Sequence, residues 1–450
     1  YVINSPKQEA IHQNFKATYF NQYSDRSKLK LDYNYQISNR KEFDVRRGNR
    51  SAKAAIDLTL KTHDFLGSIQ WKKDFEWNFE WGVNALLQDN FSNPETGVKR
   101  LIPDHQKYQA GTFLTGNYRP SNNFSWEWGF RFDQVIIDAQ KFYDTSNWIS
   151  REYNIRYAEF EQKDFGTQIL TNPRLNFSNI SAQTGFAVGI GESVETTFSY
   201  MLTQRAPNVS ELFSDGLHHS LASIEYGFIG LQKETSHKLI LGINTQNKFL
   251  SIGIDPYLNR VSNFIFIQPS GVELTIRGAF PVWEYQATDV LMWGWDAYAK
   301  INLSENLKYN INAAYTYAQD ILDAKPLISV PPFSLLQQLS YTFPKSEIEI
   351  EMAHRFTATQ SRFPDTNFRV NRIESGVIVQ QEVDISTPPN GYHNFDLYFS
   401  LPLAKSNFKS TLRLIVQNLT NASYNDYLNR LRFYATEIGR AVQLQLVFNY

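Results

Sequence analysis

Apolar and polar side chains alternate along many segments of this chain, and this alternation constrains its fold more than any other feature. In the clearest example, Leu29, Leu31, Tyr33, Tyr35 and Ile37 alternate with Lys30, Asp32, Asn34, Gln36 and Ser38. A period of two places successive side chains on opposite faces of a β-strand. The same pattern returns in residues 124–133, 307–317, 347–352 and 395–401. We therefore predict an all-β chain whose strands each have one apolar face.

Two further features favour a membrane barrel over a soluble β-sandwich, in which the apolar faces pack against a second sheet. The polar positions carry charges on strand after strand, which suits a water-filled or plugged lumen. In addition, short turns such as 304–306, 344–346 and 404–407 alternate with long connections, which are residues 39–52, 138–172, 205–233, 359–391 and 421–437. Outer-membrane barrels combine short periplasmic turns with long external loops. We therefore predict a transmembrane antiparallel β-barrel in a bacterial outer membrane.

The composition agrees with a barrel. The 33 Phe, 25 Tyr and 9 Trp make up 15% of the 450 residues, which is typical of a barrel with aromatic girdles at its interfaces. No run approaches the roughly eighteen consecutive apolar residues of a membrane helix. The chain has no cysteine, which excludes disulfide scaffolds and thiolate metal sites. Its 44 basic and 45 acidic residues nearly cancel, so no nucleic-acid partner is expected.

The pattern predicts seventeen strands. They are residues 13–23, 29–38, 53–72 with a bulge near Thr62, 77–89, 108–118, 124–138, 173–190, 194–204, 234–245, 249–268, 289–302, 307–318, 335–343, 347–358, 392–402, 408–418 and 438–450. A single-chain barrel normally has an even number of strands, because both ends of its sheet lie on the periplasmic side. With the last strand running toward the periplasm, strand 13–23 runs the same way, and residues 1–12 are expected to end an external loop. The odd count therefore predicts a chain that starts in mid-barrel, with any signal peptide removed or upstream.

Two segments resemble the TonB-dependent outer-membrane receptor family. The first contains Arg205-Ala206-Pro207-Asn208, Glu211-Leu212, Gly216, His218-His219, Glu225, Gly227, Leu231 and Glu234, with Phe228 where the family has Asn. The second resembles the family's closing hairpin and contains Val416-Gln417-Asn418-Leu419-Thr420-Asn421, Tyr424, Tyr427-Leu428-Asn429-Arg430-Leu431-Arg432 and Gly439-Arg440. The last strand ends on aromatic Tyr450, similar to the C-terminal signature that the barrel assembly machinery reads. With the strand and loop pattern, the resemblance spans nearly the whole chain.

The resemblance implies an architecture and a set of partners. Family members are 22-stranded barrels closed by an N-terminal plug, so residues 1–450 are expected to be the C-terminal part of the barrel, without five strands and the plug domain. Through that plug such a receptor would engage TonB, which pulls on the plug to open a path for substrate. The other expected partners are the lipid bilayer with its lipopolysaccharide, the barrel assembly machinery during biogenesis, and a small-molecule or metal-chelate substrate. No cofactor is expected.

The long connection 205–233 supplies the candidate ligand-binding residues, which are Arg205, Glu211, Asp215, His218, His219 and Glu225. Of these, His218 and His219 are the candidate metal ligands, because imidazole together with carboxylates suits zinc, copper or an iron complex. The alternative is that both histidines are solvated loop residues or pack on the plug. The alternative for Arg205 is a structural role at the base of the loop, beside Pro207, which cannot donate to a sheet ladder.

The connection 39–52 contains a second candidate, the cationic cluster of Arg46, Arg47 and Arg50. Local focusing of the electric field could draw an anionic chelate to such a cluster. The alternative, which we favour, is that these side chains face water or lipopolysaccharide phosphates.

No site for covalent catalysis is evident, because an enzyme with a covalent mechanism needs a nucleophile paired with a base. His354 and His393 lie on predicted strands without a Ser or Asp partner at a strand-compatible spacing, and we expect no enzyme. Our leading hypothesis is the active import of a scarce nutrient, an iron–siderophore or other metal complex, energised through TonB. The alternative is a passive porin of about 16 to 18 strands, which needs no plug. The pattern does not choose among substrates, because one fold serves many functions.

Overall fold

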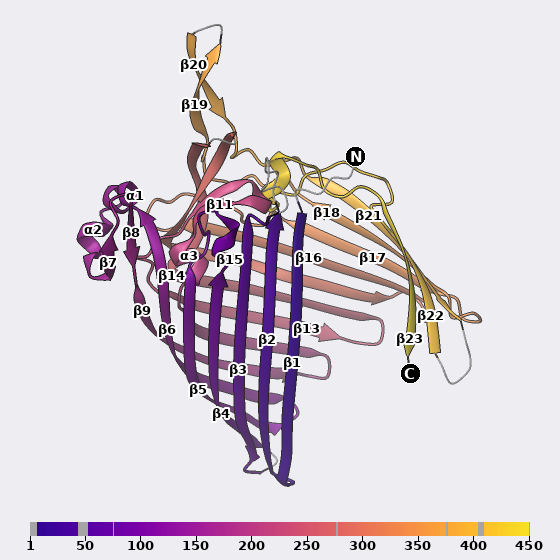
Figure 1. Ribbon diagram of the computed structural model, residues 1–450. Coiled ribbons are helices and arrows are strands. Elements are labelled where there is room, and N and C mark those ends of the chain that lie inside the picture. The colour runs from indigo at the N-terminus through magenta and orange to yellow at the C-terminus, as the bar shows by residue number, and fades with distance from the viewer. Residues whose placement is uncertain are drawn as a thin grey trace.

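The computed structural model of the protein describes residues 7–43, 53–74, 76–275, 278–374, 377–403 and 409–449. In these residues the strands form one sheet of 21 strands and a separate hairpin of two. The large sheet is strongly curved, and the hairpin of β19 (Phe368–Glu374) and β20 (Val377–Val383) projects beyond one end of it (Figure 1). None of the helices in the described residues is long and apolar enough to cross a membrane.

Seventeen strands build the curved wall, because four of the 21 strands are short and lie in connections between wall strands. The wall strands are β1 (Lys7–Ser24), β2 (Ser27–Phe43), β3 (Ile56–Lys72), β4 (Trp77–Ser92), β5 (Asp104–Ser121), β6 (Phe124–Asp144), β9 (Arg174–Ile190), β10 (Val194–Arg205), β13 (Glu234–Gln246), β14 (Leu250–Thr275), β15 (Gly278–Asn302), β16 (Leu307–Asp320), β17 (Ser334–Thr342), β18 (Glu349–Thr357), β21 (Tyr392–Pro402), β22 (Lys409–Gln417) and β23 (Ala441–Asn449). Each pairs antiparallel with the next strand of this series. They correspond one for one to the predicted segments, and the predicted fold class is confirmed.

Several boundaries of the prediction are wrong. β14 continues to Thr275 and β15 begins at Gly278, and the two pair where residues 269–288 were expected to form a connection. β1 already begins at Lys7, so residues 7–12 extend a strand instead of ending a loop. β3 begins at Ile56 and has no bulge near Thr62, because its ladders with β2 and β4 are unbroken there. The pattern changes near Thr62 because this face of β3 is polar at Asp57, Thr59 and Lys61, near the start of the strand, and apolar from Phe65 onward, while the register stays the same.

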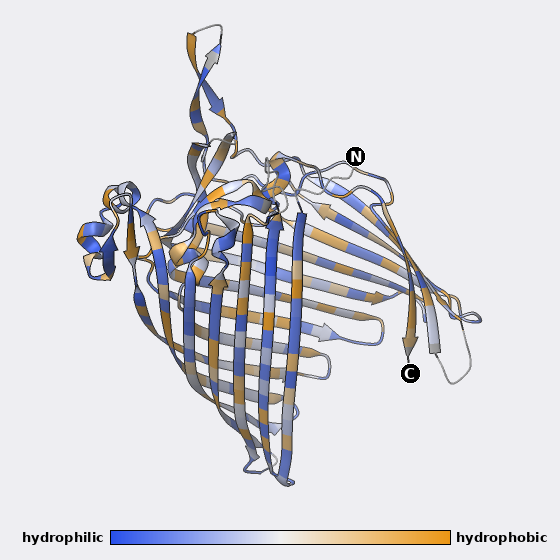
Figure 2. Cartoon of the chain, in the orientation of Figure 1, coloured by the Kyte–Doolittle hydropathy of each residue, from blue (hydrophilic) through white to orange (hydrophobic). Residues whose placement is uncertain are grey.

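The pairing aligns apolar positions of neighbouring strands on one face of the wall. Tyr33 lies opposite Phe65, Phe65 opposite Ala85, and Ala85 opposite Ala110. The residues between them face the other way, because side chains alternate along a strand. Figure 2 shows the resulting alternation of hydrophobic and hydrophilic residues along the strands. On the apolar face Phe130 is 49% exposed, which is the arrangement that lipid contact requires.

The two ends of the wall differ in how the strands are joined. At one end the connections are tight, as between Ile190 of β9 and Val194 of β10. At the other end several connections are long, and residues 206–233 and 358–391 are examples. We call this second end the mouth; the connections gather there at the top of Figure 1. The predicted turn 404–407 and the cluster of Arg46, Arg47 and Arg50 lie outside the described residues.

The wall is an open sheet. Within the ranges described above, β1 pairs along its length with β2, and β23 pairs with β22. No ladder joins β1 to β23 in this part of the chain. An open edge of this kind has backbone N–H and C=O groups that cannot be satisfied within a lipid bilayer.

The connections at the mouth carry the short elements. These are η2 (Pro94–Thr96), α1 (Thr145–Ser150), α2 (Tyr153–Arg156), η3 (Ala158–Phe160), β7 (Glu161–Asp164), β8 (Gln168–Thr171), α3 (Val209–Phe213), β11 (Asp215–His218), η4 (His219–Leu221), β12 (Ser223–Tyr226) and η5 (Arg430–Phe433). Apolar side chains from two of the connections and from β6 share one buried cluster, which includes Trp148, Tyr153, Phe213 and Ile137. This cluster holds the connections against the wall, because burying large apolar side chains is the main stabilising term available to such short elements.

Candidate functional site

The connection between β10 and β13, residues 206–233, contains five of the six predicted ligand-binding residues, and we call it the mouth loop. Its base is fixed by Arg205, the last residue of β10, whose guanidinium pairs with Glu234 at 2.6 Å and Glu211 at 2.9 Å. Glu211 also completes a capping box with Asn208 at the start of α3. The structure therefore brings together two of the predicted ligand-binding residues, Arg205 and Glu211, and their contacts hold the loop base.

The underside of the mouth loop is apolar and closely packed. Leu212 and Phe213 of α3 are fully buried in the shared cluster. Gly227 crosses the backbone of α3 so closely that a Cβ atom there would lie 2.6 Å from the carbonyl carbon of Leu212. Only glycine fits at that distance, which gives a physical reason for the glycine found in this segment.

Asp215 occupies a buried ionic cluster at the start of β11. Its carboxylate lies 2.8 Å from Nζ of Lys99 and 3.1 Å from Nζ of Lys141. Burial alone would raise the pKa of Asp215, but the two ammonium groups outweigh it and hold that pKa below its ordinary value. Lys141 lies beyond the β6–β9 ladder, where β6 pairs with β8, and burial lowers its pKa to about 8. Asp215 thus joins the mouth loop to two other parts of the mouth.

His218 and Glu225 form a second cluster on the β11–β12 hairpin. Nδ1 of His218 lies 3.2 Å from Oε1 of Glu225, and Arg430 donates to the same oxygen at 3.0 Å. Arg40 at the end of β2 donates to Nε2 of His218 at 3.0 Å. Burial alone would raise the pKa of Glu225, but His218 and Arg430 hold it below its ordinary value. With Nδ1 donating and Nε2 accepting, both ring nitrogens of His218 are engaged in protein contacts.

His219 begins η4 and is half-buried. Among the described residues no group of three or more His, Asp and Glu side chains is arranged as a metal site. The structure therefore brings His218 together with Glu225 and the end of β2, and it assigns neither histidine to a metal.

Arg430 reaches this cluster from a connection 205 residues farther along the chain. It belongs to η5 in the connection between β22 and β23, and its guanidinium lies 4.3 Å from the centre of the Trp283 ring on β15. The start of that connection is held by Asn418, which has a left-handed φ of 49° and accepts a hydrogen bond from the backbone of Ala422 at 2.8 Å. The predicted closing hairpin therefore positions a cation for the mouth loop.

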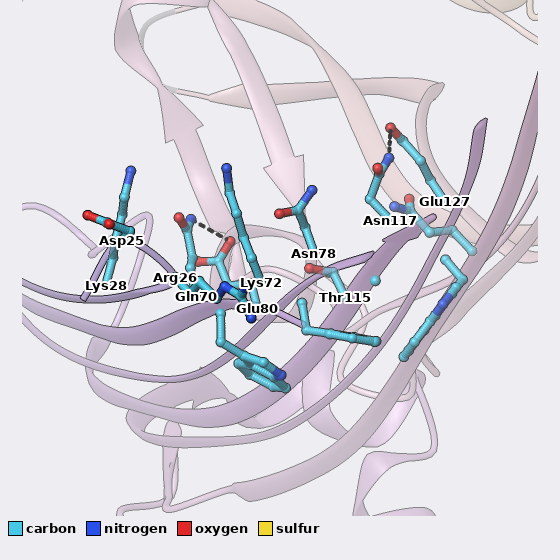
Figure 3. Close-up of a pocket in the computed structure, with 15 residues that line it drawn as sticks. Asp25, Arg26, Lys28, Gln70, Lys72, Asn78, Glu80, Thr115, Asn117 and Glu127 are labelled. Atoms are coloured by element: carbon cyan, nitrogen blue, oxygen red, sulfur yellow. Dashed lines mark hydrogen bonds between the residues drawn. The ribbon is translucent and has the colours of Figure 1, made fainter. Parts of the chain in front are cut away.

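The inner face of the wall is polar toward the tight-turn end. A hollow of about 550 Å³ lies there, and its lining includes the basic Arg26, Lys28 and Lys72 and the acidic Asp25, Glu80 and Glu127. Figure 3 shows Asp25, Lys28 and Lys72 projecting from the strands into the same space. Gln70 donates to Glu80 at 3.0 Å, and Asn117 donates to Glu127 at 2.9 Å. The charges are of both signs, as expected for a hydrated interior.

Sequence patterns missed most partners of the candidate residues. Lys99, Lys141, Arg40 and Arg430 come from four separate segments, and Arg430 is 205 residues from Glu225. Arg430 belongs to the motif of the closing hairpin, but the motif does not indicate which residue Arg430 contacts. No local spacing could have identified these pairs, because they form only when the wall curves.

Comparison with known proteins shows which family this barrel belongs to. A sequence profile described as TonB dependent receptor-like, beta-barrel matches residues 4–419. The chain belongs to this family. The receptor is therefore an outer-membrane β-barrel protein, as its strand and loop pattern predicts. No curated protein sequence matches it.

Solved structures of TonB-dependent receptors share the fold of this receptor. The copper transporter OprC superposes with a TM-score of 0.68 at 17% identity, covering 98% of this chain and 65% of its own. The ferric-catecholate import receptor Fiu from E. coli K12 gives 0.67 at 12%, with coverages of 98% and 64%. The FrpB iron transporter from Neisseria meningitidis gives 0.66 at 12%, with coverages of 98% and 63%. The chain thus spans slightly less than two thirds of the length of these structures.

Proposed function

We propose that this receptor imports a scarce nutrient, an iron–siderophore or other metal complex, in a process energised through TonB. The observation that carries the proposal is the way the mouth loop is held. Ion pairs tie it to the connection before β5, to the end of β6 and to the connection before β23, and a hydrogen bond ties it to the end of β2. Contacts that hold a loop in one position and that an incoming ligand can displace favour gated uptake over a passive pore, because a porin needs a permanently open path. The similar structures include copper and iron transporters.

We also propose that residues 1–450 form the C-terminal part of a larger barrel whose N-terminal portion supplies further strands and the plug that engages TonB. Two observations support this. In the part of the chain that the structure describes, the wall has open edges at β1 and β23, whose backbone groups lipid cannot satisfy. In addition, the similar structures extend well beyond the matched region.

For ligand contact we keep Arg205, Glu211, Asp215, His218, His219 and Glu225 as one proposed set, with different tasks. Arg205, Glu211 and Asp215 hold the mouth loop through ion pairs. His218 and Glu225 lie where three parts of the mouth meet, so a metal complex entering from outside would reach them before the lumen. An incoming complex could displace Arg40 or Arg430 from them, and this would loosen the loop.

Uptake in whole cells tests the proposal. Cells producing the full-length receptor would be given one of three radiolabelled probes in separate assays. The probes are a ferric catecholate, haem and Cu²⁺. We expect accumulation of at least one of these, abolished by a proton-gradient uncoupler and in cells lacking TonB. Cells without the receptor are the control.

Two results would overturn the proposal. Accumulation that persists with the uncoupler and without TonB would show a passive pore. Failure to accumulate any of the three probes, with the receptor present in the outer membrane in normal amount, would exclude a metal complex of these classes as cargo.

A further inference from the structure

The hairpin of β19 and β20 stands clear of the other strands above the mouth, the end of the wall that faces out of the cell (Figure 1). It forms a sheet of its own, and within the described residues no ladder joins either strand to another element. Its base is held by Asn367, whose side chain accepts hydrogen bonds from the backbone of Ile385 at 2.9 Å and of Ser386 at 3.1 Å. A two-stranded hairpin is only marginally stable in water, so this hairpin would gain from a third strand.

The two strands of the hairpin differ in how their edges are protected. β19 contains Arg369 and Arg372 and lies beside β14. β20 has the sequence VIVQQEV, which contains no lysine, arginine, proline or glycine. Proteins usually protect an exposed sheet edge with charged side chains, with proline or with a covering segment. The outer edge of β20 is therefore the one that is open to pairing.

Both faces of β20 present apolar side chains to solvent. Val377 is 63% exposed, and Ile378 on the opposite face is 68% exposed. Val379 shares the face of Val377, because side chains alternate along a strand. Toward the other end of the strand, Glu382 forms only a loose ion pair with Arg369 at 3.8 Å, and both side chains are largely exposed. The strand therefore has an apolar first half and a polar second half with one negative charge.

We infer that the outer edge of β20 binds an extended segment of a protein outside the cell, which adds to the hairpin as a third, antiparallel strand. The row of backbone N–H and C=O groups along a strand edge matches the spacing of another strand. In the antiparallel register, the first residues of the partner segment lie opposite Glu382 and its last residues lie opposite Val377. The segment should therefore have lysine or arginine near its start, followed by β-branched residues, because cross-strand pairs of opposite charge and of apolar side chains stabilise a sheet.

A second copy of the receptor fits this edge less well. Receptors in one membrane project their hairpins in the same direction, so two β20 strands could pair only in parallel. Parallel pairing is slightly less stable per residue, and in register it would place two Glu382 carboxylates side by side. A separate protein segment has neither restriction. The inference depends on the outer-membrane location and is independent of the transported substrate.

Disulfide trapping on the full-length receptor tests the inference, because residues 1–450 contain no cysteine. The probe is the peptide VKTCVTV, which in the antiparallel register has its cysteine opposite Gln380 and its lysine opposite Glu382. The receptor variant is Q380C, and the matched control is N371C, because Asn371 lies directly opposite Gln380 on β19 and both residues are exposed. With the peptide at about 0.1 mM, we expect Q380C to react roughly tenfold faster than N371C, because pairing raises the local peptide concentration to about 1 mM. Rates are normalised to the reaction of each thiol with a water-soluble maleimide, and the unchanged receptor gives the background.

Three results would overturn the inference. Equal normalised rates for Q380C and N371C would show that the edge of β20 does not hold an extended segment. Two further peptides are N-methylated at one or the other set of alternate residues, so that they keep the side chains but lose N–H donors. If both react with Q380C as fast as the unmodified peptide, the backbone is not what β20 recognises. A disulfide between two Q380C receptors that forms in preference to the peptide adduct would show that the edge pairs with a second copy. Because no transport is measured, a failed uptake assay does not affect the result.

Discussion

Nζ of Lys141, at the end of β6, lies 3.1 Å from the carboxylate of Asp215 in the mouth loop, and both residues are only 3% exposed. The contact joins two segments that are more than seventy residues apart in the chain. Together with Lys99 it makes Asp215 the anion on which three parts of the mouth converge. The mouth loop is thus held by charge as well as by its apolar underside.

The first prediction concerns this buried pair. D215N leaves Lys141 buried without its anion, and breaking such a pair costs about 3–5 kcal/mol. We expect faster hydrogen exchange of the amides in residues 215–226 in the variant than in the unchanged receptor. The control is D323N, because Asp323 and Lys325 form a pair at 3.1 Å that is largely exposed and contributes little. Equal exchange in D215N and the unchanged receptor would contradict the role given to Asp215.

The second prediction concerns acid. The native pKa of Asp215 is held low by Lys141 and Lys99, so its contribution to stability is present above the unfolded value of about 3.9 and is lost as pH falls through the lower native pKa. K99Q removes one cation, raises that pKa, and is expected to open the mouth loop at a higher pH. Cleavage of residues 206–233 by pepsin across the acid range measures this. K325Q serves as the control, and a cleavage profile of K99Q that matches it would refute the prediction.

A third prediction tests the histidines as ligand contacts. H218A/H219A should weaken uptake of the transported metal complex by roughly tenfold or more, the loss typical of a residue that supports metal binding. The amount of receptor in the outer membrane should not change. H237A is the matched control, because His237 is on the apolar face and bonds to Tyr200 at 2.9 Å. An unchanged apparent affinity for uptake in H218A/H219A would contradict the prediction and would leave both histidines with a structural role in the mouth loop only.

The fourth prediction compares the two faces of the wall. The chain has no cysteine, so a nitroxide attached through F130C or R131C reports one position. Adjacent residues of a strand face opposite sides, and we expect oxygen to relax the label at 130 while a polar nickel complex relaxes the label at 131. The reverse pattern would invert the assignment of faces for β6.

The strands themselves were predictable because alternation is a local property. A residue such as Leu31 must face the side opposite to Lys30 wherever the strand lies. Because a barrel wall separates lipid from water, this geometry produces an alternation of apolar and polar residues in the sequence. The predicted boundaries failed at β1 and near Thr62 for a related reason. Where a strand rises out of the bilayer, the solvent changes while the hydrogen-bonded ladder continues, so hydropathy no longer follows the strand.

The candidate loop was predictable from its motif, whereas the partners of its charged residues were not. Which cation neutralises Asp215 or Glu225 depends on the curvature of a seventeen-strand wall, which brings Lys141 and Arg430 to the same mouth. Alternation can be recognised from neighbouring residues in the sequence. Charge pairing and surface shape cannot, because they depend on segments that meet only after the sheet has formed.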